Sequence, residues 1–378
     1  MNRYLLILFV LVACQEPFEP PLLEGQAAIV VDGVVTDEFK AHEVTLSRSS
    51  PLDTVLEVPV SEASVQIVEN DERVFTLSEF TPGRYRSTFP FSGTIGSSYQ
   101  LRLEIEGQQY ESAPVILKAN PAIDNVDFRL DTREPSGQRG LQVLLSTTPS
   151  ESTFFRWEWQ ETYEIRSPYP RRYEWVNDEF VEFDPFPVSV CWNADSSRTV
   201  IVASTQQLEA GSASSFEIRF LNEGDPKLLE LYSIEIKQFA MDEQAFDFWR
   251  TIRDIGERQG SIFDLQPGLV LGNMRAVNNN NVILGYFDAT QLRTVRSFVG
   301  RSTLARLGLS RNNEFRFGCT EQLDTIPRFE IETYLRLNGE ERNVIGFLEF
   351  AGNGWLTGPK ECTDCRFQGS NERPSFWP

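Results

Sequence analysis

The chain has 378 residues, which suggests two domains, and 35 basic against 55 acidic residues give it a formal net charge of −20 at pH 7. Because nucleic acids and anionic lipid head groups attract clustered Lys and Arg, this acidic composition disfavours both as partners. The single histidine, His42, disfavours histidine-dependent catalytic triads and most zinc sites.

The N-terminal segment has the order of a secretory signal, because Arg3 is followed by the apolar run Leu5–Val12. This run is well short of the roughly 20 residues that a membrane-spanning helix needs. It ends in "LVAC", which resembles the lipobox of bacterial lipoproteins and implies removal of residues 1–13 and acylation of Cys14. Residues 14–26 contain three prolines and are predicted to be a lipidated tether. The alternative is ordinary secretion, with Cys14 as a structural cysteine.

Residues 27–118 have the pattern of short strands separated by turns. The clearest is "SYQLRLEI", in which Tyr99, Leu101 and Leu103 alternate with polar residues. Strands at such short intervals predict a small antiparallel β-sandwich of the immunoglobulin-like type. His42 lies in "KAHEVTLS", a pattern that predicts a solvent-facing position on a strand edge.

Residues 119–378 are predicted to form a larger β-rich domain, so the fold class is mainly β. In "FFRWEWQETYEI" the aromatic residues share one face with Glu161, which we interpret as a bulge or rim position and not as a buried acid. One clear amphipathic helix is predicted near 242–256, with Asp242 as its N-cap and an apolar stripe facing the core.

The remainder of this domain is predicted to be strands and loops. "GLVLGNMRAV" and "VILGYFDAT" flank an asparagine-rich turn and indicate a β-hairpin. Further strands are predicted near Arg328–Leu337 and Val344–Phe350.

A proline-rich segment between these elements carries six aromatic side chains. They are Tyr169, Tyr173, Trp175, Phe180, Phe183 and Phe186. The four prolines of the segment exclude a central strand. Two interpretations have equal weight: a loop at 168–192 that presents the aromatic side chains to a partner or ligand, and a hairpin folded over the core.

If Cys14 is lipidated, four cysteines remain: Cys191, Cys319, Cys362 and Cys365. An even number in an exported protein predicts disulfides, with three possible connectivities. A redox role for "CTDC" is disfavoured because a proline precedes it and no helix pattern follows. A zinc site built from all four thiolates is the minor alternative.

Several of these segments together resemble one known family. They are "GSSYQLRLEIEGQQYES", "WEWQETYEI", "SIFDLQPGLVLGN" and "CTDCRFQGSNERPSFW". The chain is similar to the Bacteroidetes outer-membrane lipoproteins that contain domain of unknown function 4249. Genes of this family commonly lie beside those of TonB-dependent receptors of the nutrient-uptake type. The acidic residues after Cys14 are similar to the signal that exports such lipoproteins to the outer face. The family has no established catalytic residues, so the resemblance assigns none.

The resemblance implies a non-enzymatic lipoprotein that is lipid-anchored in the outer membrane, faces the cell surface and uses no cofactor or metal. It would assist a TonB-dependent transporter by capping the barrel or capturing substrate. One alternative is an adhesin or outer-membrane assembly factor that binds another protein. Another is a glycoside hydrolase, which requires two carboxylates about 5–10 Å apart in a cleft.

Overall fold

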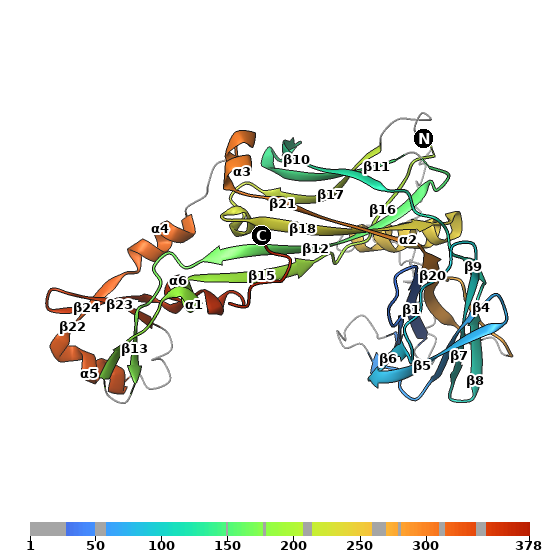
Figure 1. The fold of residues 1–378 in the computed structure, drawn as a ribbon, viewed down its shortest axis with the longest axis horizontal. Coiled ribbons are helices and arrows are strands. Elements are labelled where there is room, and N and C mark those ends of the chain that lie inside the picture. The colour runs from blue at the N-terminus through green and yellow to red at the C-terminus, as the bar shows by residue number, and fades with distance from the viewer. Residues whose placement is uncertain are drawn as a thin grey trace, which may run out of the picture.

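The computed structural model describes residues 28–49, 58–148, 150–176, 179–206, 214–258, 270–278, 281–309, 314–337 and 345–378. The predicted signal (1–13), Cys14 and the tether (14–26) lie outside the described residues. With 53% strand and 16% helix, the fold is mainly β, as expected. The molecule is elongated and has three parts along its length: an N-terminal sheet, central sheets, and a small module at the opposite end (Figure 1).

The N-terminal sheet has eleven strands in the order β19-β8-β7-β4-β5-β6-β2-β1-β20, with β3 and β9 attached beside this path. The strands are β1 (Ile29–Thr36), β2 (Glu43–Arg48), β3 (Val58–Pro59), β4 (Ser64–Glu69), β5 (Arg73–Thr81), β6 (Arg84–Ser87), β7 (Ser98–Ile105), β8 (Gln108–Ser112), β9 (Val115–Ile116), β19 (Met274–Ala276) and β20 (Ile283–Thr290). The two outermost strands, β19 and β20, also contact each other, so the sheet is nearly closed and barrel-like.

An immunoglobulin-like sandwich of residues 27–118 is not shown, because the strands form one sheet and two of them come from later in the chain. β20 pairs in parallel with β1 from Ile29 to Thr36, and β19 pairs with β8. The predicted hairpin of the β19 and β20 segments is therefore wrong. Each strand has the expected strand pattern, but each finds its partner in the N-terminal part, which local sequence does not specify.

The central part consists of two sheets packed face to face (Figure 1). One contains β10 (Ile123–Arg133), β11 (Gln138–Thr147) and β17 (Ser214–Asn222). The other contains β15 (Val190–Ser196), β12 (Phe154–Arg166), β18 (Tyr232–Met241) and β21 (Leu292–Val299), with β16 (Ile201–Ser204) beside β12. Trp157 and Phe155 of β12 lie in the core between the two sheets. The short η1 (Pro226–Leu228) and α3 (Arg301–Leu307) lie at its margins.

Glu161 is fully buried in this core, so its assignment to a bulge or rim was wrong. Its carboxylate accepts a hydrogen bond from the Tyr232 hydroxyl at 2.8 Å and from Arg219 Nε at 3.2 Å, and it pairs with Lys227. Arg219 belongs to β17 of the facing sheet, so the ion pair joins the two sheets. Hydrogen bonds to Glu161 and Asp195 raise the pKa of Lys227 against the opposing effect of burial. A buried acid is tolerated here because two cations from distant segments meet it.

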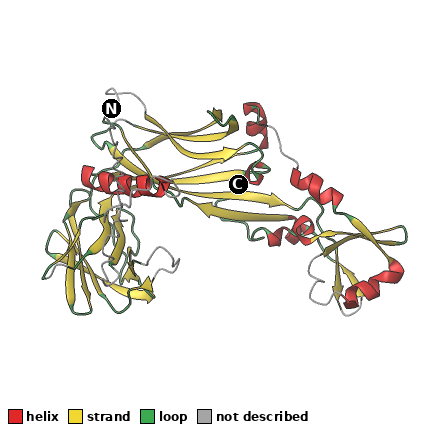
Figure 2. Cartoon of the chain, turned by 180° about the vertical axis from the view of Figure 1, so that it is seen from behind, coloured by secondary structure: helices red, strands yellow, loops and turns green. Residues whose placement is uncertain are grey.

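Helix α2 (Glu243–Arg258) confirms the predicted amphipathic helix. The Asp242 carboxylate accepts a hydrogen bond from the Ala245 amide at 2.8 Å and caps the helix start. Phe246 and Phe248 pack on β12, β16 and β20, so the helix lies where the central sheets meet the N-terminal sheet (Figures 1 and 2). None of the helices in the described ranges has the length and apolar character that crossing a membrane requires.

We call the third part the distal module. Its strands form one sheet: β13 (Tyr173–Val176), β14 (Glu179–Glu182), β22 (Asp324–Pro327), β23 (Ile345–Ala351) and β24 (Gly354–Pro359). Its helices are α4 (Glu314–Glu321) and α5 (Arg328–Leu337), while α1 (Phe186–Ser189), α6 (Lys360–Thr363) and η3 (Cys365–Phe367) lie near its junction with the central sheets (Figure 1).

The strand predicted near Val344–Phe350 is present as β23, but the strand predicted at Arg328–Leu337 is wrong, because this segment is helix α5. Apolar residues alternate along "RFEIETYLRL", which imitates a strand. Ile331 and Leu335 are four residues apart and are both buried, which is the helical spacing.

His42 is only 1% exposed, so its predicted solvent-facing position is also wrong. Its Nε2 donates a hydrogen bond to the Phe91 carbonyl at 3.0 Å, and its ring lies 4.4 Å from the Phe91 ring. Burial lowers the pKa of His42 from 6.5 to about 4. The folded protein therefore holds this ring neutral at a pH where the unfolded chain protonates it.

This burial predicts a pH-dependent stability. The contribution of His42 is complete above pH 6.5 and is lost as the pH falls toward 4, because only the unfolded chain binds the proton in that interval. The loss amounts to about 3 kcal/mol. We expect His42→Gln, which keeps a donor for Phe91, to remove this part of the pH dependence in urea unfolding between pH 7.5 and 4.5. If the free energy of unfolding changed with pH equally in the two proteins, His42 would not be the source of the pH dependence.

Candidate functional site

The candidate site is the distal module, which contains most of the predicted aromatic residues. Strands β13 and β14 form a hairpin, so the hairpin interpretation of this segment is correct. Tyr173, Trp175 and Phe180 point inward; the Phe180 ring lies 4.7 Å from Trp175 and 3.9 Å from Trp355 of β24. These three aromatic side chains are partly buried and pack against the core of the module.

The other three predicted aromatic residues have different surroundings. The Tyr169 hydroxyl lies 2.6 Å from the hydroxyl of Thr320 in α4. Phe183 is half-buried, with the Arg171 guanidinium 4.7 Å from its ring centre. Phe186 is 68% exposed. Of the six predicted contact residues, Phe186 is thus the one that is open to solvent.

Sequence reasoning missed other exposed apolar side chains of the module. Phe329 on α5 is 82% exposed, and Phe350, Val181 and Val176 are between 42% and 48% exposed. Val176 and Val181 alternate with the inward aromatic residues of the hairpin. Phe329 lies about 200° around the helix from the buried Ile331, at 100° per residue, which places it on the outer side. The strand and helix periods provide this signal once the elements are assigned.

Two disulfides join the segments of the module to each other and to the central sheets. Cys191 of β15 is bonded to Cys365, and Cys319 of α4 is bonded to Cys362. This is one of the three connectivities left open by the sequence, and it confirms the prediction of disulfides over the zinc alternative for these four cysteines. The pairs are 174 and 43 residues apart in the sequence.

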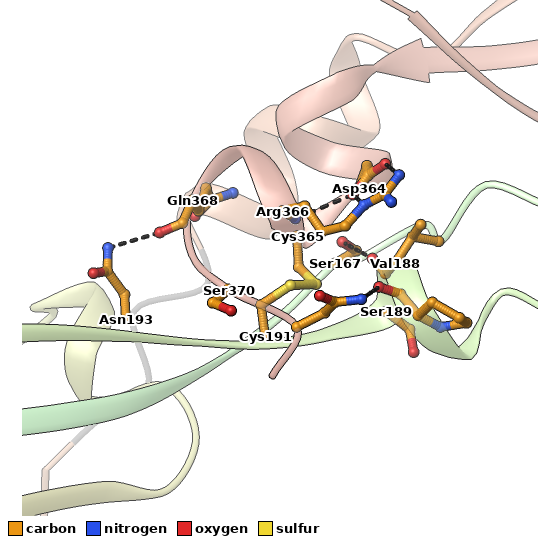
Figure 3. The surroundings of a disulfide bond; sticks show 12 residues. Ser167, Val188, Ser189, Cys191, Asn193, Asp364, Cys365, Arg366, Gln368 and Ser370 are labelled. Carbon is orange, nitrogen blue, oxygen red and sulfur yellow. Dashed lines mark hydrogen bonds and ion pairs between the residues drawn. A yellow bond between two sulfur atoms is a disulfide. The ribbon is translucent and has the colours of Figure 1, made fainter. Parts of the chain in front are cut away.

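Asp364 lies between the two bonded cysteines of "CTDC" and is 1% exposed. Its carboxylate accepts hydrogen bonds from Arg366 Nη2 at 2.7 Å and Arg366 Nε at 2.9 Å, and from Arg171 Nε at 3.1 Å (Figure 3 shows the Arg366 side of this contact). Burial opposes ionisation, but the hydrogen bonds from Arg366 and Arg171 outweigh it and lower the pKa of Asp364. Asp364 therefore links the β12–β13 connection to the C-terminal segment through charge.

Backbone hydrogen bonds complete this junction. The Arg171 amide donates to the Thr363 carbonyl at 2.9 Å, and Trp192 and Ser370 exchange two amide–carbonyl hydrogen bonds of 2.8 and 2.9 Å. The Asn193 side chain donates to the Gln368 carbonyl at 2.7 Å (Figure 3). The C-terminal segment is thus attached on both sides of Cys365, which fixes how the distal module meets β15.

The exposed side chains of the β13–β14 hairpin are apolar and acidic. No group of three or more His, Cys, Asp or Glu side chains suited to a metal ion occurs within the described ranges. The outward side chains of the hairpin are Val176 and Val181 beside Glu174 and Glu179, an apolar surface with acidic neighbours.

Comparison with known families is consistent with the resemblance inferred from the sequence. The profile of the family described as Domain of unknown function (DUF4249) matches residues 15–296. The chain therefore belongs to this family. The matched range includes Cys191 and the β13–β14 hairpin and ends before Cys319. No curated protein matches the chain.

The junction predicts that Asp364→Asn is destabilising. Asn keeps the shape but removes the charge between Arg171 and Arg366, and breaking a buried ion pair typically costs about 3 kcal/mol or more. Asp71→Asn is the matched control, because Asp71 also pairs with an arginine but is 81% exposed, and a surface pair contributes about 1 kcal/mol or less. Urea unfolding at neutral pH measures both. Equal small effects would show that Asp364 does not hold the junction.

Proposed function

We propose that the protein is a non-enzymatic lipoprotein that is anchored through Cys14 in the outer membrane, exposed at the cell surface, and an accessory partner of a TonB-dependent transporter. In this role it caps the barrel or captures substrate. The lipobox sequence and the likeness to Bacteroidetes outer-membrane lipoproteins support the anchor and the partner. The N-terminal sheet, in place of the expected immunoglobulin-like sandwich, serves as spacer or docking platform.

The observation that carries the proposal is the position of the exposed apolar side chains. Phe329 on α5 is the most exposed large apolar side chain among the described residues, and it lies on the distal module, at the far end of the molecule from the N-terminal sheet (Figure 1). The N-terminal part also exposes apolar side chains, among them Phe39 and Phe89. An exposed apolar patch on a protein usually marks an interaction site. A net charge of −20 also repels anionic head groups, which favours a body that extends away from the membrane toward a partner.

The proposal predicts that the receptor contacts the distal end of the molecule and not the N-terminal sheet. A photo-crosslinking amino acid at position 329 should capture a TonB-dependent receptor in intact cells. Phe89 supplies the matched control, because it is 78% exposed but lies in the loop that follows β6 of the N-terminal sheet. Crosslinked products are identified by mass spectrometry after purification of the outer membrane.

Capture of a receptor from position 329 and not from position 89 is the expected result. Capture of a different surface protein from position 329 would replace the transporter with the adhesin or assembly-factor alternative. Capture from position 89 alone would place the contact on the wrong end of the molecule and would overturn the proposal.

A further inference from the structure

A second feature of the molecule lies far from the distal module, beside helix α2. An open pocket of about 640 Å³ is bounded by the first two turns of the helix, residues 270–272 and Tyr286 of β20. Its volume is within the roughly 300–1,000 Å³ of pockets that hold small molecules. The pocket thus has the size of a ligand site.

The charged side chains that line the pocket are all acidic among the described residues. Asp242, Glu243 and Asp247 line it, and none of its described lining residues is basic. Asp247 pairs with Arg250 at 2.8 Å, whereas Asp242 and Glu243 form no ion pair with a described residue. Asp242 caps the helix through Oδ1, and its Oδ2 accepts no hydrogen bond from a described residue. The pocket therefore favours a positively charged ligand.

Tyr286 provides independent evidence for a ligand. The residue is 3% exposed, and its hydroxyl forms no hydrogen bond with any described part of the chain. Burial, and after it the negative charges of Asp242 and Asp288, raise the pKa of Tyr286, so the hydroxyl stays protonated. Tyr286 and Asp242 line the same pocket. Buried tyrosine hydroxyls usually have a partner. A ligand with N–H donors would supply one here.

The remaining walls combine the polar side chains Gln244 and Thr251 with apolar ones. The Phe248 ring lies 5.2 Å from the Tyr286 ring, and Val270 adjoins the same side of the pocket. A Cβ at Gly272 would come within 1.6 Å of the Gly285 carbonyl oxygen, so the wall at Gly272 is pressed directly against β20. Aromatic faces attract cations within about 6 Å of the ring centre.

We propose that this pocket binds a small aliphatic amine, with one ammonium group between Asp242 and the Tyr286 hydroxyl and the hydrocarbon chain against Phe248. Glu243 and Asp247 are four residues apart and lie on one face of α2, about 6 Å apart along its axis. They are placed to receive a second ammonium group, so a diamine fits best. The pocket belongs to the isolated chain, so this site does not depend on the proposed transporter.

Isothermal titration of the full chain in detergent with 1,5-diaminopentane tests the proposal. We expect saturable binding that is weaker for 1-aminopentane and not detectable for pentane-1,5-diol. Asp242→Asn, which keeps a good N-cap residue, should weaken diamine binding by about tenfold, and Tyr286→Phe by about fivefold, as expected for one charged contact and one hydrogen bond. Asp254→Asn is the control, because Asp254 is on the same helix but does not line the pocket.

Two results would overturn the site. Equal binding of the diol and the diamine would show that charge does not select the ligand. Equal losses for Asp242→Asn and Asp254→Asn, with Tyr286→Phe unchanged, would show only a general attraction of cations to an acidic surface. Circular dichroism of each variant establishes that the fold is retained.

Discussion

The distal half of the molecule depends on the junction formed by Asp364 and the two disulfides around it. The distal module is built from two segments, 167–189 and 314–367, which leave the central sheets at different points of the sequence. Among the described residues, the strand pairing joins the hairpin to the later segment at one position, Tyr173 with Phe347, and the Phe180 ring packs on Trp355. A unit of this size buries a smaller fraction of its surface than a large domain does, so cross-links to the central sheets add to its stability.

The junction supplies that support in two ways. The buried Asp364 carboxylate pairs with Arg171, whose side chain is 9% exposed, and with Arg366, whose side chain is 45% exposed. The Cys191–Cys365 bond restricts a loop of 174 residues, which is worth about 5 kcal/mol in the chain-entropy treatment. The exposed side chains of the module are therefore held in one place relative to the central sheets, and a contact surface needs such preorganisation to bind without a large entropic cost.

Local sequence patterns predicted much of the fold but not its long-range pairing. The mainly β class, the α2 helix and the presence of disulfides followed from periodicity, capping and cysteine number. The parallel pairing of β1 with β20 did not, because no local signal reports which distant strand completes a sheet. The prediction for Glu161 was wrong for a similar reason. An acid on an apolar face is usually placed at the rim, unless basic side chains pair with it in the core. The two that do so here, Arg219 and Lys227, are 58 and 66 residues away in the sequence.

For the candidate site too, local sequence patterns indicated the elements but not how they pack. The aromatic residues Tyr173, Trp175 and Phe180 pack against the core of the distal module. Exposed apolar residues such as Phe329 could be identified only once α5 was known to be a helix. The structure thus distinguishes the distal module from the pocket beside α2, which composition alone does not. The distal module exposes apolar side chains such as Phe329, and the pocket beside α2 is lined by acidic side chains.

The central proposal is that the distal module, held in place by its two disulfides, binds a receptor in the outer membrane. The most direct measurement is recovery of a TonB-dependent receptor with the purified lipoprotein, compared between the natural chain and the Cys191→Ser/Cys365→Ser variant at equal amounts in the membrane fraction. The account predicts that the receptor accompanies the natural chain and is largely lost from the variant. No receptor with the natural chain, or equal recovery with both proteins, would contradict it.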